Sequence, residues 1–185
     1  MNIVFMGTPE FALPTLRKIY NSSHSIISVV TQPDRPKGRG QIKVASPIKN
    51  FAIENNIPLL QPANVNAENF IQLLLEKRPD YIIVVAFGQI LREALLKVPK
   101  QFCINLHSSL LPKYRGAAPI NRAIINGDAR SGVTTMIMDK GMDTGDILLI
   151  RETSIDKDDD AKSLHDKLAE QGGNCLLYTS PSPRD

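Results

Sequence analysis

Short runs of apolar residues alternate along this chain with segments whose apolar residues recur at helical spacing. Residues 81–87, YIIVVAF, are apolar without interruption, which is typical of a parallel strand buried on both faces. Strands are predicted at 2–6, 25–31, 57–60, 81–87 and 101–106, and helices at 10–20, 46–55, 66–77 and 117–126. The alternation predicts an α/β fold, doubly wound and Rossmann-like, with a mostly parallel sheet and helices on both faces.

The last third of the chain departs from simple alternation. Residues 131–139 are rich in β-branched side chains and predict a strand, and 146–155 predict a strand that returns antiparallel to it. Residues 159–170 predict a helix with an acidic first turn. From Gly172 the helical pattern breaks, so residues 1–171 are expected to form one domain and 172–185 a foreign or truncated tail.

The basic residues of the chain are concentrated in one segment. Residues 31–50 contain five Lys or Arg and a single Asp, a local charge of +4, whereas the whole chain carries only +3. Prolines and glycines in the stretch QPDRPKGRG predict a loop without regular structure over about a dozen residues. The positive charge therefore belongs to one loop.

Composition and sorting signals narrow the class of protein. With 185 residues, 42% hydrophobic and 22% charged, the chain is expected to form a folded domain and not a disordered one. Cys103 and Cys175 cannot form a disulfide framework or a four-thiolate zinc site. The first residues, MNIVFMGTPE, lack the basic and apolar regions expected of a signal peptide, and the longest aliphatic run is too short to cross a membrane. We expect a soluble, cytoplasmic monomer with no membrane partner.

Candidate chemistry follows two of the predicted strands. Asn105 and His107 are two residues apart at the end of strand 101–106, so they face the same way if the strand continues through them. Asp143 lies between two glycines after strand 131–139, with Asp139 and Asp146 as alternative carboxylates. An amide that holds an oxyanion, an imidazole that moves protons and a carboxylate that orients it suit acyl or formyl transfer to an amine. Capping residues at a strand end are the simpler alternative.

Other catalytic motifs are missing from the sequence. It contains no GxGxxG, GxxxxGK[ST], HExxH or GxSxG pattern, which argues against nicotinamide, ATP, zinc-protease and hydrolase chemistry. The three histidines are far apart in sequence, so no metal site is expected. His24 and His165 are interpreted as surface residues.

Two long segments resemble a known family. NLHSSLLPKYRGAAPINRAIINGD, followed by SGVTTMIMDKGMDTGDIL, closely resembles the folate-dependent formyltransferases, and the resemblance runs from Met1 to about Gln171. GTPEFA and TQPDRPKGRG point within the family to members that act on initiator tRNA. The resemblance implies transfer of a formyl group from 10-formyltetrahydrofolate to the α-amino group of methionine on initiator methionyl-tRNA, without a metal. It also implies a C-terminal β-barrel with further tRNA contacts, and the chain is expected to end before that domain.

The resemblance assigns roles to individual residues. Asn105, His107 and Asp143 match the family's catalytic residues. The residues expected to contact folate are Ser109, Leu110, Leu111, Pro112, Phe87, Gly88, Gln89, Ile90 and Leu91. The basic loop is expected to contact tRNA through Arg39, together with Arg35, Lys37 and Lys43.

Two alternatives remain open. One is a formyltransferase for a small amine, such as an amino sugar nucleotide or glycinamide ribonucleotide, because NLHSSLLPKYRG is widely shared. A local charge of +4 favours a polyanionic substrate instead. The other is a truncated, non-catalytic module that binds tRNA or folate, against which the three polar residues argue.

Overall fold

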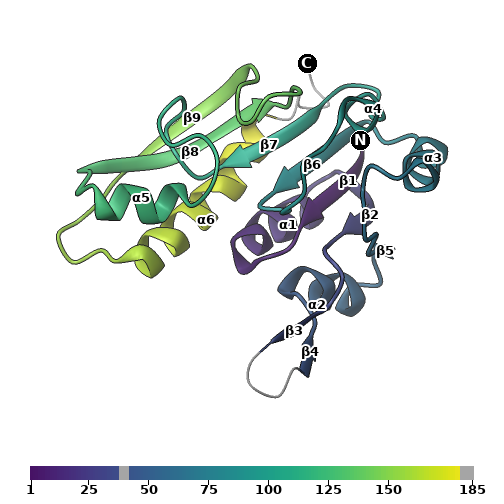
Figure 1. Cartoon of the computed structure of the whole chain (residues 1–185), viewed down its shortest axis with the longest axis horizontal. Coiled ribbons are helices and arrows are strands. Elements are labelled where there is room, and N and C mark those ends of the chain that lie inside the picture. Colours follow the sequence, from purple (N-terminus) through teal and green to yellow (C-terminus); the bar gives the residue numbers. More distant parts are fainter. Residues whose placement is uncertain (38–41, 180–185) are drawn as a thin grey trace.

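A computed structural model describes residues 1–37 and 42–179 of the chain. Within these ranges a seven-stranded sheet forms the centre of the molecule, and its first five strands run parallel while the last two are antiparallel (Figure 1). In spatial order the strands are β5 (Leu59–Leu60), β2 (Ser25–Val30), β1 (Asn2–Gly7), β6 (Tyr81–Val85), β7 (Cys103–His107), β8 (Arg130–Ile137) and β9 (Ile147–Ser154). The predicted fold class is confirmed.

Helices cover both faces of this sheet. The helices are the 3-10 turn η1 (Glu10–Ala12), α1 (Leu13–Tyr20), α2 (Pro47–Glu54), α3 (Glu68–Lys77), α4 (Glu93–Leu96), α5 (Pro119–Ile125) and α6 (Ala161–Thr179). One core lies under α1, α2, α5 and α6, and the other under α3 and α4. Strand alternation separates the two cores: Phe5 joins the first, and Val4 and Met6 join the second. The predicted helix start at Ser46 is confirmed, because its side chain accepts a hydrogen bond from the Lys49 amide.

The basic segment is more regular than predicted. Two short strands, β3 (Arg35–Lys37) and β4 (Ile42–Val44), pair antiparallel and project from the body as a hairpin (Figure 1). The prediction of a segment without regular structure was wrong for these residues. Each strand of a two-stranded ribbon has one edge without a partner strand. A proline whose nitrogen faces that edge removes no hydrogen bond between the strands. Residues 38–41, and with them Arg39, lie outside the described residues.

The last helix is longer than predicted. α6 continues past the expected break at Gly172 and ends at Thr179. A Cβ at Gly172 would come within 2.4 Å of Leu106, and one at Gly173 within 2.7 Å of Lys18, so both glycines are sites of close approach. Cys175 and Leu176 beyond them are buried. Burial of this last part of the helix outweighs the weak helix propensity of two glycines. Residues 180–185 lie outside the described residues.

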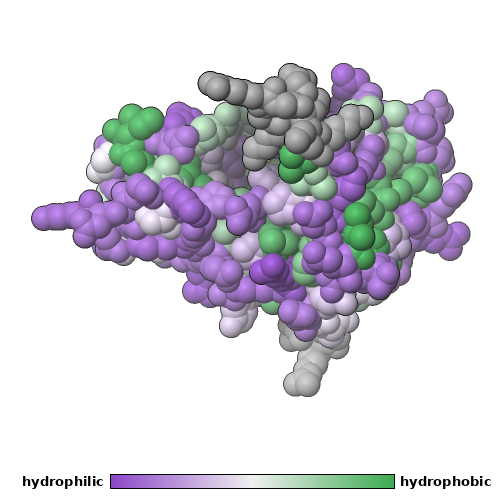
Figure 2. Space-filling view, turned by 90° about the horizontal axis from the view of Figure 1, so that it is seen from below, coloured by the Kyte–Doolittle hydropathy of each residue, from purple (hydrophilic) through white to green (hydrophobic). Residues whose placement is uncertain are grey.

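The surface is mostly polar. Figure 2 shows a largely hydrophilic face on which hydrophobic residues gather in separate patches. Exposed hydrophobic side chains include Ile125 near the end of α5 and Met142 in the loop between β8 and β9. Among the residues that the structure describes, no helix has both the length and the apolar character needed to span a membrane.

Candidate active site

Strand β7 carries two of the predicted site residues. It continues through His107, so Asn105 and His107 project from the same face of the strand. Their exposed fractions are only 9% and 8%. Ile104 and Leu106, which alternate with them, belong to the core under α1 and α6. The strand therefore anchors two polar side chains at the carboxyl end of the sheet with little freedom to move.

Asp143 reaches this pair from the loop between β8 and β9. One of its carboxylate oxygens, Oδ2, accepts a hydrogen bond of 2.8 Å from the Gly116 amide and lies 3.5 Å from His107 Nδ1. The other, Oδ1, accepts a bond of 3.4 Å from Asn105 Nδ2. Asp143 itself has a φ of 54°, in the left-handed region. The three side chains form one polar group, called here the Asn–His–Asp group.

The imidazole of His107 is held between two acceptors. Its Nε2 lies 2.9 Å from the carbonyl oxygen of Tyr114, and its Nδ1 faces the Asp143 carboxylate. Donation from Nε2 to that carbonyl places the proton of the neutral ring on Nε2 and leaves Nδ1 as the basic atom; this tautomer is assigned from the hydrogen-bond partners.

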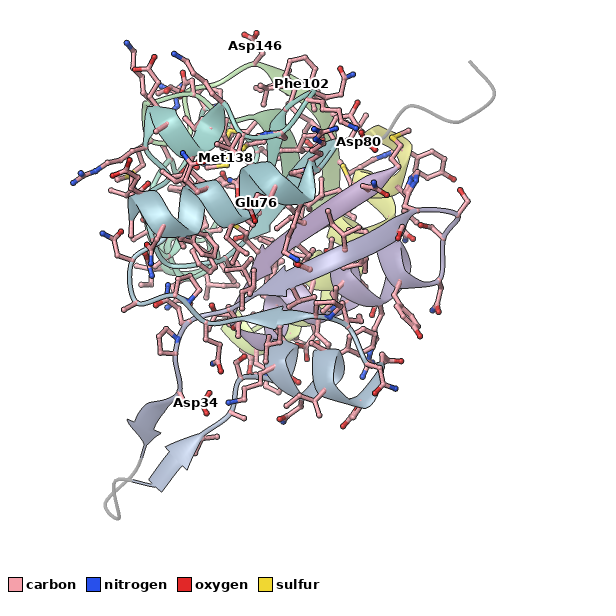
Figure 3. The ribbon with its side chains drawn as sticks, turned by 90° about the vertical axis from the view of Figure 1, so that its right-hand side faces the viewer. Asp34, Glu76, Asp80, Phe102, Met138 and Asp146 are labelled. Atoms are coloured by element: carbon pink, nitrogen blue, oxygen red, sulfur yellow. The ribbon has the colours of Figure 1, made fainter. Side chains whose placement is uncertain are left out.

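The two alternative carboxylates lie elsewhere. Asp139 is exposed and accepts hydrogen bonds from the Gly141 amide and the Thr144 hydroxyl within its own turn. Asp146 is also exposed and lies at the periphery in Figure 3. Of the three candidates, the structure brings only Asp143 to Asn105 and His107.

A cavity of about 740 Å³ opens beside the Asn–His–Asp group. One part of its wall comes from the core under α3 and α4, through Val84, Phe87 and Leu91. The opposite part comes from the core under α1 and α6, through Phe11 and Ile120. The cavity therefore bridges the two faces of the sheet at its carboxyl edge, where open α/β sheets bind ligands, and its volume suits a small-molecule substrate.

The residues predicted to contact folate fall into two sets. All of residues 87–91 line the cavity. Residues 109–112 are not among the lining residues; Ser109 is buried, and its hydroxyl and carbonyl groups bond to Lys113 and Thr134. This segment braces the turn that carries Tyr114, the partner of His107. Direct contact between residues 109–112 and a ligand stays a prediction.

The structure adds His165 to the cavity wall, contrary to the prediction of a surface position. Its side chain is only 30% exposed, and its ring packs edge-on against Phe11 at a centroid distance of 5.4 Å. The spacing along the helix could have predicted this inward position, because residue 165 shares a helix face with the buried Leu168 and Ala169.

A second cavity of about 580 Å³ adjoins the first on the side of the hairpin. It is lined by residues 32–34, before β3, and by residues 44–47, from the last residue of β4 to the first of α2. Both cavities share Pro9 and residues 86–88 as a common wall. The predicted tRNA contacts Arg35, Lys37 and Lys43 belong to the hairpin strands. The two adjoining cavities thus lie between the hairpin and the Asn–His–Asp group.

The described residues give little support to a cysteine nucleophile or a metal site. Burial raises the pKa of the Cys103 thiol to about 12, so the thiol stays protonated at neutral pH and is a poor nucleophile. Within residues 1–37 and 42–179, no group of three or more His, Cys, Asp or Glu side chains is arranged to hold a metal ion.

The family model described as "Formyl transferase" matches residues 1–179 of the chain. The chain belongs to the formyl transferase family. It is 54% identical over 179 residues to the methionyl-tRNA formyltransferase of Geobacter sulfurreducens. The aligned part covers 97% of this chain but only 56% of that relative, so the chain spans little more than half of the relative's length.

Solved formyl transferase structures share the fold. A phosphoribosylglycinamide formyltransferase from Bacillus halodurans superposes with a TM-score of 0.79 at 21% identity, over 97% of this chain and 92% of the other. A sugar 3N-formyl transferase solved in the presence of dTDP and 5-N-formyl-THF superposes with a TM-score of 0.68 at 25% identity, over 94% of this chain and 59% of the other. The similarity to the phosphoribosylglycinamide formyltransferase shows the fold alone. The sugar 3N-formyl transferase was solved with a folate present.

Proposed function

We propose that this formyl transferase moves the formyl group of 10-formyltetrahydrofolate to the α-amino group of initiator methionyl-tRNA. The observation that carries the proposal is the convergence of Asn105, His107 and Asp143 beside a cavity of about 740 Å³. The identity of 54% with a methionyl-tRNA formyltransferase supports the choice of acceptor. The hairpin and its basic residues support a polyanionic acceptor.

The geometry suggests how the reaction proceeds. The methionine amine attacks the formyl carbon, and the formyl oxygen becomes an oxyanion. Asn105 Nδ2 has two hydrogens; one points at Asp143, and the other is available to hold this oxyanion. The His107 imidazole takes the amine proton and delivers it to N10 of tetrahydrofolate as the carbon–nitrogen bond breaks. Asp143 stabilises the imidazolium in between, and the Tyr114 carbonyl keeps the ring oriented.

The two substrates are assigned to different walls of the cavity. Residues 86–91 would line the site of the folate, as the resemblance implies. The opposite wall, with Pro9, Phe11 and His165, would then receive the methionyl group. A methionine side chain suits an aromatic wall, because thioether sulfur packs favourably against rings. The acceptor end would reach this wall from the hairpin through the second cavity, which shares Pro9.

The decisive experiment compares acceptors for the purified chain with 10-formyltetrahydrofolate as donor. The acceptors are methionyl initiator tRNA, free methionine, an amino sugar nucleotide and glycinamide ribonucleotide, and formylated product is measured by mass spectrometry. We expect formylation of methionyl-tRNA with the highest kcat/KM. Faster transfer to either small amine would favour the alternative enzyme, and binding without any transfer would favour a non-catalytic module.

Reversal of the charge at Arg39 tests the role of the hairpin. Arg39→Glu is expected to raise the KM for methionyl-tRNA by about tenfold at moderate salt, because a phosphate contact is replaced by repulsion. The KM for folate should stay unchanged. Lys157→Glu, at an exposed position before α6, is the matched control for a change of two charge units. Equal effects of the two variants would remove the hairpin from tRNA recognition.

We infer a monomer in the cytoplasm, as the sequence suggests, and the reaction scheme routes no step through a metal ion. Sedimentation of the purified chain would test the oligomeric state.

A further inference from the structure

The loop of residues 86–91 has an unusual main chain. Ala86 has a φ of 47° and Gly88 a φ of 88°, so both lie in the left-handed region. This conformation is costly for Ala86, which carries a Cβ atom. A loop in such a conformation keeps its shape only where surrounding contacts hold it. The contacts that hold this loop therefore determine the shape of the cavity wall.

Gln32 provides two of these contacts. Its Nε2 donates a hydrogen bond of 3.3 Å to the Phe87 carbonyl, and its Oε1 accepts one of 3.3 Å from Gln89 Nε2. The same Phe87 carbonyl also accepts a bond of 3.1 Å from the Thr8 hydroxyl. Gln32 is only 8% exposed and does not line the larger cavity. It thus holds the loop from behind and lines the second cavity, outside the space proposed for the folate.

Gln89 completes the connection from the other side. Its Oε1 accepts a bond of 3.1 Å from the Val65 amide, and its Nε2 also lies 3.3 Å from the Ala63 carbonyl. The bonds of Gln32 and Gln89 together fix residues 87–89 between the end of β2 and the segment before α3. Loss of the Gln32 carboxamide would leave Gln89 with its bonds to residues 63–65 and remove one of the two donors to Phe87.

The main chain of Gln32 is tied to the root of the hairpin. Its carbonyl accepts a bond of 2.9 Å from Gln61 Nε2, which also donates to Asp34 Oδ1 at 3.0 Å. Asp34 in turn pairs with Lys49 at 2.5 Å. Figure 3 shows Asp34 where the hairpin meets the body of the protein. A continuous series of contacts therefore runs from the residue before β3 to the cavity loop.

We propose that Gln32 is a positioning residue that holds the 86–91 loop in its folate-binding shape. This inference rests on the proposed function for the identity of the ligand. The position requires glutamine, because the side chain must donate to the Phe87 carbonyl and accept from Gln89 at the same time. An ionised glutamate could only accept, and it would place a negative charge against a carbonyl oxygen.

The test measures the Kd of 5-formyltetrahydrofolate for the 185-residue chain by calorimetry, with melting temperatures in parallel. Gln32→Ala is expected to weaken folate binding by about five- to tenfold, the effect of one or two lost hydrogen bonds. The matched control is Gln61→Ala, because Gln61 bonds to the main chain of the same residue and to Asp34, and within the described part of the chain it makes no hydrogen bond to the loop. Its Kd should stay within twofold of the wild type even if its melting temperature falls.

Gln32→Glu adds a readout that general destabilisation would not produce. Its folate affinity should be weakest at neutral pH and recover as the pH falls through the pKa of the new carboxyl, because the protonated form can again donate to Phe87. Equal Kd values for the wild type and Gln32→Ala would overturn the proposal. So would equal weakening by Gln61→Ala, or a Gln32→Glu variant with the same pH dependence as the wild type.

The outcomes separate this proposal from the proposed function. Binding of 5-formyltetrahydrofolate needs no acceptor, so a wild-type chain that binds folate but does not formylate methionyl-tRNA refutes only the choice of acceptor. Wild-type binding with unchanged Gln32 variants refutes only the positioning role. A wild-type chain that does not bind folate refutes both.

Discussion

Alanine at Asn105 or His107 will lower kcat for formyl transfer to methionyl-tRNA by roughly a hundredfold to ten-thousandfold. Loss of an amide that holds a developing oxyanion costs on the order of 10²–10³ in kcat, and loss of a general base costs on the order of 10²–10⁴. Both side chains are nearly buried and face Asp143 or the Tyr114 carbonyl, so no other described side chain of the group can replace them. The KM for each substrate should change by only a few fold, because the lost interactions strengthen in the transition state.

Matched variants make this prediction specific. His24→Ala removes a histidine that lies far from the cavity wall, and Asn121→Ala removes an exposed asparagine that borders it. Both should retain most of the wild-type turnover. Asp143→Asn keeps the shape of the side chain but removes the charge beside His107 Nδ1, so it should fall between these controls and His107→Ala. Single-turnover kinetics with saturating substrates would measure the chemical step directly. A fully active His107→Ala variant would refute the scheme.

Alanine at Gly145 will have the second large effect, although this residue makes no proposed contact with substrate. A Cβ at this position would lie 1.8 Å from the Ile137 carbonyl oxygen and 2.9 Å from its carbon. Both are main-chain atoms of β8, and the Ile137 amide bonds at 2.9 Å to the Asp146 carbonyl. The strand end and the loop must therefore separate to make room. Asp143, two residues earlier in the loop, would move away from His107.

We expect Gly145→Ala to lower turnover by about a hundredfold and to cost roughly 1–3 kcal/mol of folding free energy, the usual range for overpacking. In a protein of this size that corresponds to a fall in melting temperature of about 3–10 °C. Lys140→Ala, at an exposed position of the same loop, is the control and should behave like the wild type. Circular dichroism melts and kcat measured well below the melting temperature separate the two effects. Wild-type turnover in Gly145→Ala would show that the loop tolerates displacement without losing the Asn–His–Asp group.

The sequence by itself determined those features that depend on neighbours along the chain. Hydrophobic periodicity depends on local geometry, so it identified the βα alternation and the fold class. The cap at Ser46 and the antiparallel return of β9 were predictable for the same reason. Asn105 and His107 face one way because side chains alternate along a strand, and β7 continues far enough for this to hold.

Only the tertiary structure decided features that depend on segments distant in sequence. The local pattern left Asp139 and Asp146 open beside Asp143, which the family resemblance selected. The physical contact that places Asp143 with Asn105 comes from the fold of the β8–β9 loop onto β7 and Gly116. The cavity position of His165 depends on how α6 packs against Phe11. Gly172 broke the helical pattern in the sequence, yet the helix continues because Cys175 and Leu176 beyond it are buried. Hydrophobic periodicity shows which face of a helix or strand is buried. Long-range contacts, which no local pattern encodes, determine which other element packs against that face and how closely.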